Sequence, residues 1–181
     1  LNADGEINSN DATRDIGYTD MPEYTAGLNT GFSWKNFDFS MQWTGAWNVD
    51  RMLDEFRRPL GDTNEKGLLL YQYDTTWRSS ADTFTAKFPR TSSLHASNNY
   101  AGSDLYLINA SYLRLKSVEI GYNFNFPFMK KLKMDSCRLY VNGYNLITIT
   151  GFKWGDPESR QSSRPNYPLT RVFNIGLKLG F

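Results

Sequence analysis

The last eleven residues of the chain, positions 171–181, alternate between large apolar side chains and small or polar ones. The odd positions carry Phe173, Ile175, Leu177, Leu179 and Phe181, and the even positions after Val172 carry Asn174, Gly176, Lys178 and Gly180. A period of two is typical of a β-strand with one apolar face and one polar or crowded face. This strand alone fits two environments equally. One is the buried face of a soluble sandwich, and the other is the lipid-facing wall of a membrane barrel, where an aromatic residue lies at the boundary between hydrocarbon and headgroups.

The composition narrows the class of protein further. A net charge of +1 at pH 7 indicates neither nucleic acid nor an anionic membrane surface as a partner. One cysteine and one histidine exclude a disulfide framework and a cysteine- or histidine-rich metal site. No run approaches the ~18 consecutive apolar residues of a transmembrane helix. Aromatic residues make up 15% of the chain and glycine is plentiful, which favours an all-β chain with long polar loops.

Four earlier segments have the pattern of strands. Residues 24–34 and 37–47 each alternate for eleven residues, and the two-residue break Lys35-Asn36 between them predicts a hairpin. Strands of this length suit a tilted membrane crossing better than the roughly five or six residues usual in soluble sheets. The next predicted strands are residues 111–124 and 136–149. Within 111–124 the apolar positions change parity near Lys116-Ser117, which indicates either a β-bulge or a strand that leaves the membrane halfway along.

Short and long connections alternate between these five predicted strands. Lys35-Asn36 and residues 125–135 are short connections, whereas residues 50–104 and 150–170 are long and irregular. An up-and-down membrane barrel has this alternation, with short periplasmic turns and long outer loops, and Greek-key sandwiches do not require it.

The predicted strands cannot form a complete barrel by themselves. Five strands are too few to close, and an open strand edge is not tolerated in lipid. We therefore expect residues 1–181 to be the carboxyl-terminal segment of a barrel whose other strands lie in another polypeptide or in a part of the protein outside this sequence. The first residue, Leu1, supports this expectation because it is neither an initiator methionine nor the start of a signal sequence.

Residues 1–11 match the spacing of an EF-hand-type calcium loop. When Gly5 is aligned with the glycine of such a loop, Asn2 and Asp4 fall on positions 3 and 5, the Glu6 carbonyl on position 7, and Asp11 on position 12. Calcium takes about six to eight oxygen ligands, and this spacing wraps oxygens around a turn that glycine forms readily. The first position would precede Leu1, and position 12 is Asp rather than the usual bidentate Glu. The alternative is an Asx-turn loop without an ion.

Ligand contacts are expected from the long loops rather than from a catalytic centre. Aromatic faces stack on sugar rings, and Arg binds carboxylates in a bidentate manner. The loop residues with these properties are Trp77, Arg78, Arg90, Tyr100 and Trp154. Each could instead pack within the loops or contact a partner protein. No acid–base or nucleophile constellation stands out, so the chain is not expected to be an enzyme, and a hydrolytic β-domain is the least supported class.

A series of short motifs runs in order through nearly the whole chain. They are Asn2-Ala3-Asp4-Gly5-Glu6-Ile7-Asn8, Ile16-Gly17, Pro22-Glu23-Tyr24, Lys35-Asn36-Phe37-Asp38, Pro89-Arg90, Ser111-Tyr112-Leu113-Arg114-Leu115-Lys116, Ile120-Gly121-Tyr122-Asn123, Arg138-Leu139-Tyr140-Val141, Asn145-Leu146, Gly155-Asp156-Pro157-Glu158, Tyr167-Pro168 and the terminal Phe181. This ordered set resembles the carboxyl-terminal part of the SusC/RagA family of TonB-dependent outer-membrane transporters of Bacteroidetes. The Ser111–Lys116 run is the most specific of the motifs.

The resemblance implies a fold and a function. The chain would be all-β and supply the last five antiparallel strands of a transmembrane β-barrel of about 22 strands, with long extracellular loops. It would lie in the outer membrane of a Gram-negative, Bacteroidetes-like cell, and the plug and earlier strands would lie outside it. The whole protein would import an oligosaccharide or a peptide and be energised by TonB through the plug. A SusD-like surface lipoprotein would cover it as a lid. Neither a nucleic-acid partner nor an organic cofactor is implied, and the choice between glycan and peptide stays open.

A soluble, calcium-dependent carbohydrate-binding β-sandwich is the alternative reading. The aromatic content and the calcium-like loop support it, and it requires Phe173, Ile175 and Leu177 to face a second sheet. Extraction of the protein from cells without detergent would favour this alternative over the transporter.

The calcium expectation yields a first prediction. If the ion binds to residues 1–11, Asp4→Ala removes a ligand, and we expect the loop to become more sensitive to proteases. The wild-type loop should likewise be cut faster in chelator than in calcium. Limited proteolysis under both conditions measures the difference, and identical rates in calcium and chelator would refute the ion.

Overall fold

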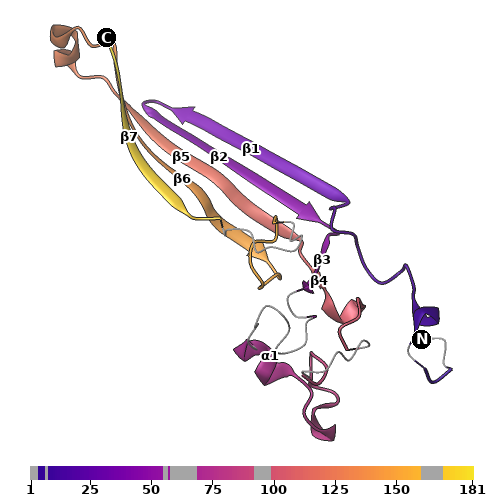
Figure 1. The fold of residues 1–181 in the computed structure, drawn as a ribbon. Helices are drawn as coiled ribbons and strands as arrows, with labels where there is room; N and C mark the ends of the chain where they lie inside the picture. The colour runs from indigo at the N-terminus through magenta and orange to yellow at the C-terminus, as the bar shows by residue number, and fades with distance from the viewer. Residues whose placement is uncertain (1–3, 7, 55–56, 58–68, 92–98, 160–168) are drawn as a thin grey trace. The chain divides into compact units, whose positions relative to one another are not determined.

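The computed structural model describes residues 4–6, 8–54, 57, 69–91, 99–159 and 169–181 (Figure 1). The chain forms two compact units. One comprises Leu1–Met21 and Asp50–Asn109, and the other comprises Pro22–Val49 and Ala110–Phe181. None of the helices in the described part has the length and apolar character needed to cross a membrane.

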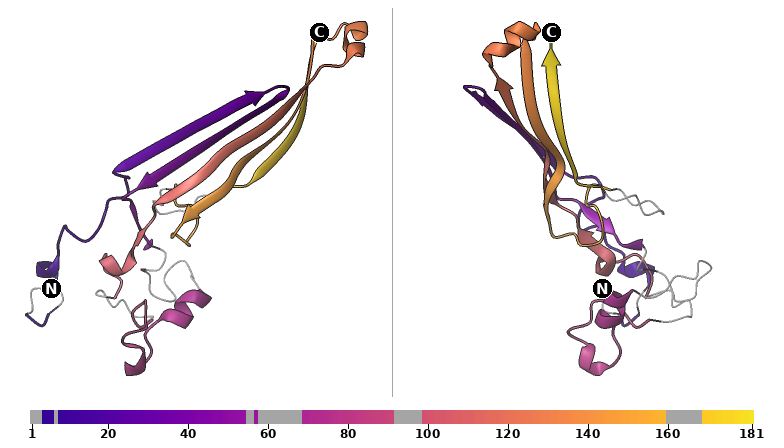
Figure 2. Two further views of the ribbon diagram at one scale, coloured as in Figure 1. Left: turned by 180° about the vertical axis from the view of Figure 1, so that it is seen from behind. Right: turned by 90° about the vertical axis from the view of Figure 1, so that its left-hand side faces the viewer.

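The second unit is a single antiparallel sheet of five strands in the order β1-β2-β5-β6-β7. Its strands are β1 (Tyr24–Trp34), β2 (Phe37–Trp47), β5 (Tyr112–Phe124), β6 (Ser136–Thr150) and β7 (Val172–Gly180). Each strand pairs with the strand that precedes or follows it within the sheet, and the long strands run side by side in a curved surface (Figures 1 and 2). The prediction of an all-β chain with five long antiparallel strands is therefore confirmed.

The connections alternate as the sequence indicated. Trp34 pairs with Phe37, so the β1–β2 turn contains only Lys35 and Asn36, and Lys35 adopts a φ of 54°. The β5–β6 turn holds a short 3-10 helix, η5 (Pro127–Leu132). These two turns and the carboxyl terminus lie at one end of the sheet, and the two long connections leave from the other end (Figure 1).

A bulge interrupts the pairing of β5 with β2 at Lys116. Leu115 pairs with Trp43 and Ser117 pairs with Gln42, so Lys116 is an additional residue on β5. A bulge inserts one residue into one strand and reverses the parity of the side chains beyond it. This is the bulge that the parity change in the sequence predicted, and the strand continues through it without leaving the sheet.

The next strand compensates for the bulge with an additional residue of its own. Between Tyr144 and Ile147 of β6 lie Asn145 and Leu146, which together oppose Lys116. Asn145 has a φ of 54°, a left-handed conformation that Asn tolerates better than most residues. The Leu146 side chain lies against Gly143, where a Cβ atom would come within 2.9 Å of the Leu146 methyl groups. The irregularity therefore extends across β2, β5 and β6. The apolar side chains of the three strands stay on the same face of the sheet on both sides of it.

One face of the sheet is apolar on all five strands. From the registers, its members are Tyr24, Ala26, Leu28, Thr30, Phe32, Trp34, Phe37, Phe39, Met41, Trp43, Gly45, Trp47, Leu113, Leu115, Val118, Ile120, Tyr122, Phe124, Cys137, Leu139, Val141, Gly143, Ile147, Ile149, Phe173, Ile175, Leu177 and Leu179. No charged residue belongs to this set of described positions. Several members are well exposed, with Phe173 at 71% and Ile175 at 78% of their accessible surface.

The opposite face of the sheet carries the polar side chains. Its members include Asn29, Asp38, Ser40, Gln42, Thr44, Arg114, Ser117, Glu119, Asn123, Arg138, Tyr140, Asn142, Tyr144, Thr148, Asn174 and Lys178. A sheet with a well-exposed apolar face and a polar face is the pattern of a barrel wall between lipid and an aqueous interior.

The first unit contains a small sheet that the sequence did not predict. Its strands, β3 (Asp50–Met52) and β4 (Leu107–Asn109), pair in an antiparallel manner. The Asp50 carboxylate accepts hydrogen bonds from the Tyr18 backbone N–H at 2.7 Å and from the Asn109 side-chain amide at 3.3 Å. These bonds attach the segment before β1 to the strand pair. The unit also contains α1 (Leu70–Thr75) and the 3-10 helices η1 (Ser9–Asp11), η3 (Ser80–Asp82) and η4 (Asp104–Tyr106).

Tyr106 is the main buried aromatic residue of the first unit. Its hydroxyl donates a hydrogen bond of 2.6 Å to the Asn99 carbonyl, and its ring lies 6.2 Å from that of Phe88. Burial raises the pKa of Tyr106 to about 12. The phenol is therefore neutral throughout the physiological range and contributes as a packed hydrogen-bond donor.

The apolar face gives the second prediction. If this face contacts lipid, Leu177→Arg places a cation there at a cost of roughly 2–4 kcal/mol at the bilayer midplane, so we expect reduced membrane levels of the intact protein. Val172→Arg on the same strand is the matched control, because Val172 pairs with Tyr144 on the polar face and the substitution should be tolerated. Immunoblotting of membrane fractions compares the two variants. Equal, wild-type levels of both would contradict lipid exposure of Leu177.

Candidate functional site

The polar face of the sheet is the candidate functional surface, and a cluster around Arg138 occupies one part of it. Arg138 on β6 bonds both carboxylate oxygens of Asp38 on β2 and lies 2.8 Å from the Glu119 Oε1 on β5. The Asn142 side chain donates to the Glu119 Oε2 at 3.1 Å, and the Asn174 side chain donates to the Asn142 Oδ1 at 2.9 Å. We call these five residues the Arg138 cluster. It links β2, β5, β6 and β7 side chain to side chain across the sheet.

Two glycines make room for this cluster. A Cβ atom on Gly121 would lie 2.5 Å from the Asp38 Oδ2 and closer still to the Arg138 guanidinium. Gly176 on β7 lies beneath the Tyr140 ring, which would collide with any side chain there. The Arg138 guanidinium lies 5.1 Å from the centre of the same ring, a cation–π distance. A larger residue at either position would displace the side chains that cross over it.

The charges of the Arg138 cluster are compensated locally. Asp38 and Glu119 contribute two negative charges, Arg138 contributes one positive charge, and Lys178 lies opposite Arg138 in the β6–β7 register. The cluster itself carries a net charge of −1, and Lys178, which lies outside the cluster, brings the local sum to zero. The side chains of the ion pairs are partly exposed, so solvent screens them, and they stabilise the sheet less than a buried pair would. This part of the polar face therefore presents amides, hydroxyls and aromatic rings without a strong net field.

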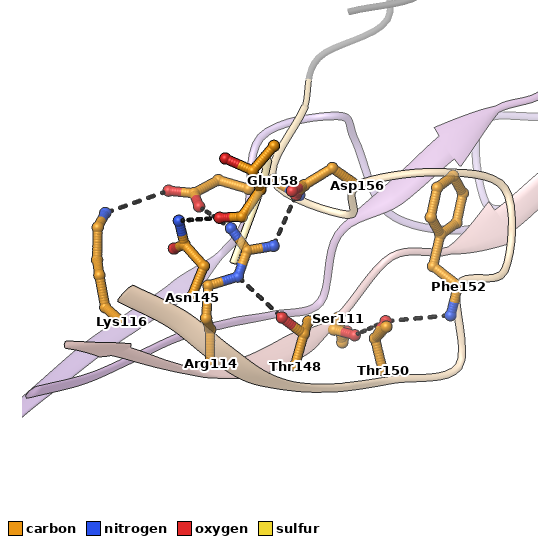
Figure 3. Close-up of polar contacts among 10 residues, drawn as sticks. Ser111, Arg114, Lys116, Asn145, Thr148, Thr150, Phe152, Asp156 and Glu158 are labelled. Atoms are coloured by element: carbon orange, nitrogen blue, oxygen red, sulfur yellow. Dashed lines mark hydrogen bonds and ion pairs between the residues drawn. The ribbon is translucent and has the colours of Figure 1, made fainter. Parts of the chain in front are cut away.

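A second cluster surrounds Arg114 near the end of the sheet from which the long connections leave (Figure 3). The Arg114 side chain is only 2% exposed. Its Nη2 lies 2.7 Å from the Asp156 Oδ1, its Nη1 lies 2.8 Å from the Glu158 Oε2, and its Nε donates to the Thr148 Oγ1 at 3.1 Å. Lys116 lies 3.8 Å from the other Glu158 oxygen. We call these five residues the Arg114 cluster.

The Arg114 cluster fixes the course of the β6–β7 loop. Arg114 belongs to the polar face because it pairs with Thr44 of β2 and Thr148 of β6. Its carboxylate partners, Asp156 and Glu158, belong to the loop, so residues 151–159 turn back against the polar face (Figure 3). Removing one partner of a buried ion pair typically costs about 3–5 kcal/mol, because the remaining charge is left without compensation.

Hydrogen bonds of the Thr150 hydroxyl to two backbone groups hold the same loop at its start. The Thr150 hydroxyl donates to the Ser111 carbonyl at 2.8 Å and accepts from the Phe152 N–H at 3.0 Å (Figure 3). The Phe152 side chain is buried. Within the turn, the Asp156 Oδ1 also accepts from the Glu158 N–H at 2.9 Å, which shapes the turn that presents both carboxylates to Arg114.

The predicted ligand-contact residues Trp77 and Arg78 lie in the first unit, directly after α1. The Trp77 N–H donates to the Phe88 carbonyl at 2.9 Å, and the residue is half-buried. The exposed Arg78 guanidinium lies 4.3 Å from the Tyr73 ring centre, and the Asp82 carboxylate accepts from the Arg78 backbone N–H at 3.0 Å. The two residues therefore take part in loop packing, and their contact with a ligand stays a prediction.

The other three predicted residues are divided between the two units. In the first unit, the Arg90 carbonyl accepts from the Asn99 side chain at 3.3 Å, next to Tyr100 in the chain. Trp154 lies in the second unit, within the loop that the Arg114 cluster holds. Of the five predicted contact residues, Trp154 lies in the loop that is bonded to the polar face of the sheet. Ligand binding by all three stays a prediction.

Arg114 and Arg138 are functional-site residues that the sequence marks only as members of longer motifs. Each of these arginines occupies a polar-face position of a long alternating strand. An arginine at such a position needs a counter-charge from a neighbouring strand or loop, and this pattern could have identified both residues.

The calcium-like segment contains local turns. The Glu6 N–H donates to the Asp4 Oδ1 at 2.8 Å, the Asn8 N–H donates to the Asp11 Oδ2 at 3.0 Å, and Gly5 has a φ of 85°. These contacts fit the Asx-turn alternative, and Asn2 lies outside the described residues. Among the described residues, no group of three or more His, Cys, Asp or Glu side chains is placed to hold a metal ion. The calcium ion stays a prediction.

Comparison with known proteins gives sequence relatives over the whole chain. No family model matches. The chain is 29% identical over 198 residues to TonB-dependent receptor P3 of Formosa agariphila and 28% identical over 182 residues to TonB-dependent receptor SusC of Bacteroides thetaiotaomicron. TonB-dependent receptor P26 of Formosa agariphila is 24% identical over 196 residues. These alignments cover 99–100% of this chain and 17–19% of the relatives, so the chain spans about a fifth of their length.

Solved structures share the fold. The RagAB peptide importer in its closed-closed state matches with a TM-score of 0.71 at 19% identity, covering 98% of this chain and 20% of that chain. The open-open state matches with a TM-score of 0.69 at 21% identity, covering 91% and 18%. The resemblance that the sequence motifs predicted is confirmed. The sequence relatives are named receptors, in agreement with the expectation that the chain is not an enzyme.

The Arg138 cluster gives the third prediction. Gly121→Ala places a methyl group against the ends of the Asp38 and Arg138 side chains, so we expect the partly exposed ion pair to open and the folded protein to lose up to about 1 kcal/mol of stability. Gly27→Ala is the matched control on the same face, because its Cβ would meet nothing nearer than the Trp43 carbonyl at 3.8 Å. The temperature at which the intact protein that contains this chain loses its folded mobility on a gel measures the effect. Equal temperatures for the two variants would contradict the crowding at Gly121.

Proposed function

We propose that this chain, which is related to SusC-type TonB-dependent receptors over its whole length, forms part of the barrel wall of an outer-membrane nutrient importer. The observation that carries the proposal is the separation of the two faces of the sheet. One face is apolar and uncharged in every described strand, and the other carries both ionic clusters. Lipid and a water-filled interior are the two environments that such a sheet separates.

The two edges of the sheet call for further strands. β1 and β7 are the edge strands, and their outer backbone groups have no partner strand within this sheet. In hydrocarbon every backbone N–H and C=O group must be hydrogen-bonded, so strands outside this sequence would pair with β1 and β7 to complete the barrel. The remainder of the barrel and its plug are therefore the first partners that we propose.

The polar face would line the transport path. Its amides, hydroxyls and tyrosine rings suit both sugars and peptide groups, and the balanced charge of the Arg138 cluster and Lys178 selects against neither. We propose an oligosaccharide or a peptide as the substrate. Trp77, Arg78, Arg90, Tyr100 and Trp154 remain the candidate contact residues in the loops.

Energy and ligand capture would come from other components. The relatives are named TonB-dependent receptors, which supports energisation by TonB through a plug outside this sequence. The name RagAB denotes a complex with a second component, which supports a SusD-like surface lipoprotein that covers the barrel as a lid.

The soluble-sandwich alternative is less well supported. It requires Phe173, Ile175 and Leu177 to be covered by a second sheet, and all three are well exposed within the described residues. The fold match to an importer also favours the barrel wall.

The fourth prediction tests this function with the intact protein that contains this chain. We expect it to remain in the membrane fraction until detergent is added and to co-purify with a lipoprotein and a bound oligosaccharide or peptide, identified by mass spectrometry. Cells that lack the protein should lose uptake of the identified ligand, and a protonophore should abolish uptake in wild-type cells. Release of the protein without detergent, or uptake that is unchanged in its absence, would overturn the proposal.

A further inference from the structure

We propose that Arg114 is the positioning residue of the β6–β7 loop and that it makes residues 151–159 a fixed part of the outer mouth of the transport path. The inference rests on the proposed function in one respect, namely that the polar face lines that path. The loop geometry itself does not depend on the function.

Hydrogen bonds to three different residues converge on the Arg114 side chain. Arginine presents five N–H donors in a planar fork, and here Nη1, Nη2 and Nε each bind a different residue. One partner, Thr148, belongs to the sheet, and the other two, Asp156 and Glu158, belong to the loop. The guanidinium is therefore a bridge between the rigid wall and the loop. Lysine, with a single ammonium group on a flexible stem, cannot reproduce this planar geometry.

The Arg114 side chain is also buried. The Arg114 side chain is 2% exposed, and a buried cation is tolerated only when counter-charges compensate it. If the loop left the polar face, Arg114 would lose both carboxylates at once. The two ion pairs therefore favour the folded-back loop over an open one. Lys116 and Glu158 complete an arrangement of two positive and two negative charges.

The loop is held at two points, one before Trp154 and one after it. Phe152 is buried, and its N–H is bonded to Thr150. Asp156 and Glu158 are bonded to Arg114. Only the short segment from Lys153 to Gly155 lies between these two points. Trp154 is therefore presented from a fixed segment of loop, which suits a residue that contacts a ligand.

The fifth prediction tests the positioning role in the intact transporter, purified in detergent. Lys153 is exposed and lies between the two points of attachment, so it provides a tryptic site that reports on the loop. Proteolysis of a transiently opened segment follows the population of its open form. We expect Arg114→Met to accelerate cleavage after Lys153 roughly tenfold or more, and Arg114→Lys to give an intermediate rate. Mass spectrometry of the fragments assigns the cleavage.

The matched control is Arg138→Met, which removes the other polar-face arginine and should leave cleavage after Lys153 at the wild-type rate. If Arg114→Met does not assemble, the variant Asp156→Asn with Glu158→Gln removes the loop charges instead and should expose Lys153 in the same way. A wild-type cleavage rate in a correctly assembled variant of either kind would overturn the proposal, as would equal acceleration by Arg138→Met.

Uptake of the identified ligand separates positioning from stability. A loop that presents Trp154 affects ligand binding, so we expect Arg114→Met to raise the half-saturating ligand concentration while the maximal rate per folded transporter stays close to the wild-type value, with partial rescue by Arg114→Lys. An unchanged half-saturating concentration would overturn the role in the transport path. The proteolysis needs no uptake, so a transporter without the proposed activity would fail only this last measurement.

Discussion

The bulge at Lys116 is the constraint on which the rest of the sheet depends. Side chains in a strand alternate with a period of two, so a single additional residue would transfer every following side chain to the opposite face. Lys116 on β5 and the pair Asn145 and Leu146 on β6 absorb the shift together. Leu113 and Val118 consequently lie on the same apolar face although their positions differ in parity. One face can then remain free of charge from one end of the sheet to the other.

Because the apolar face carries no charged residue, the charged side chains of the sheet lie on the polar face and need counter-charges there. Arg138 finds its counter-charges on neighbouring strands and remains partly exposed, whereas Arg114 is buried and finds them in the β6–β7 loop. The two clusters therefore have different consequences. The Arg138 cluster joins strands that already pair through their backbones. The Arg114 cluster determines the position of a loop that backbone pairing alone would leave undirected.

Periodicity predicted most of the large sheet, and it did so for a physical reason. Strands with one apolar and one polar face alternate over their whole length, so β1 and β2 could be delimited to the residue and the bulge could be located from the parity of the leucines. The β3–β4 pair was missed because three-residue strands have too few positions to show a period. The partners of Arg114 were missed because Asp156 and Glu158 lie more than forty residues away in the chain, and local patterns carry no information about such contacts. The calcium ligands and the loop contacts remain predictions, since they depend on spacing and residue type alone.

The most direct test of the account is the environment of each residue along β7 in the intact protein that contains this chain, reconstituted in a bilayer. Single spin labels would be placed in turn at positions 173, 174, 175, 177, 178 and 179, with Cys137 replaced by serine, and their accessibility to oxygen and to a water-soluble nickel complex would be measured. The account predicts a period of two, with oxygen favoured at Phe173, Ile175, Leu177 and Leu179 and nickel favoured at Asn174 and Lys178. Uniform accessibility along the strand, or the opposite phase, would contradict the assignment of the apolar face to lipid.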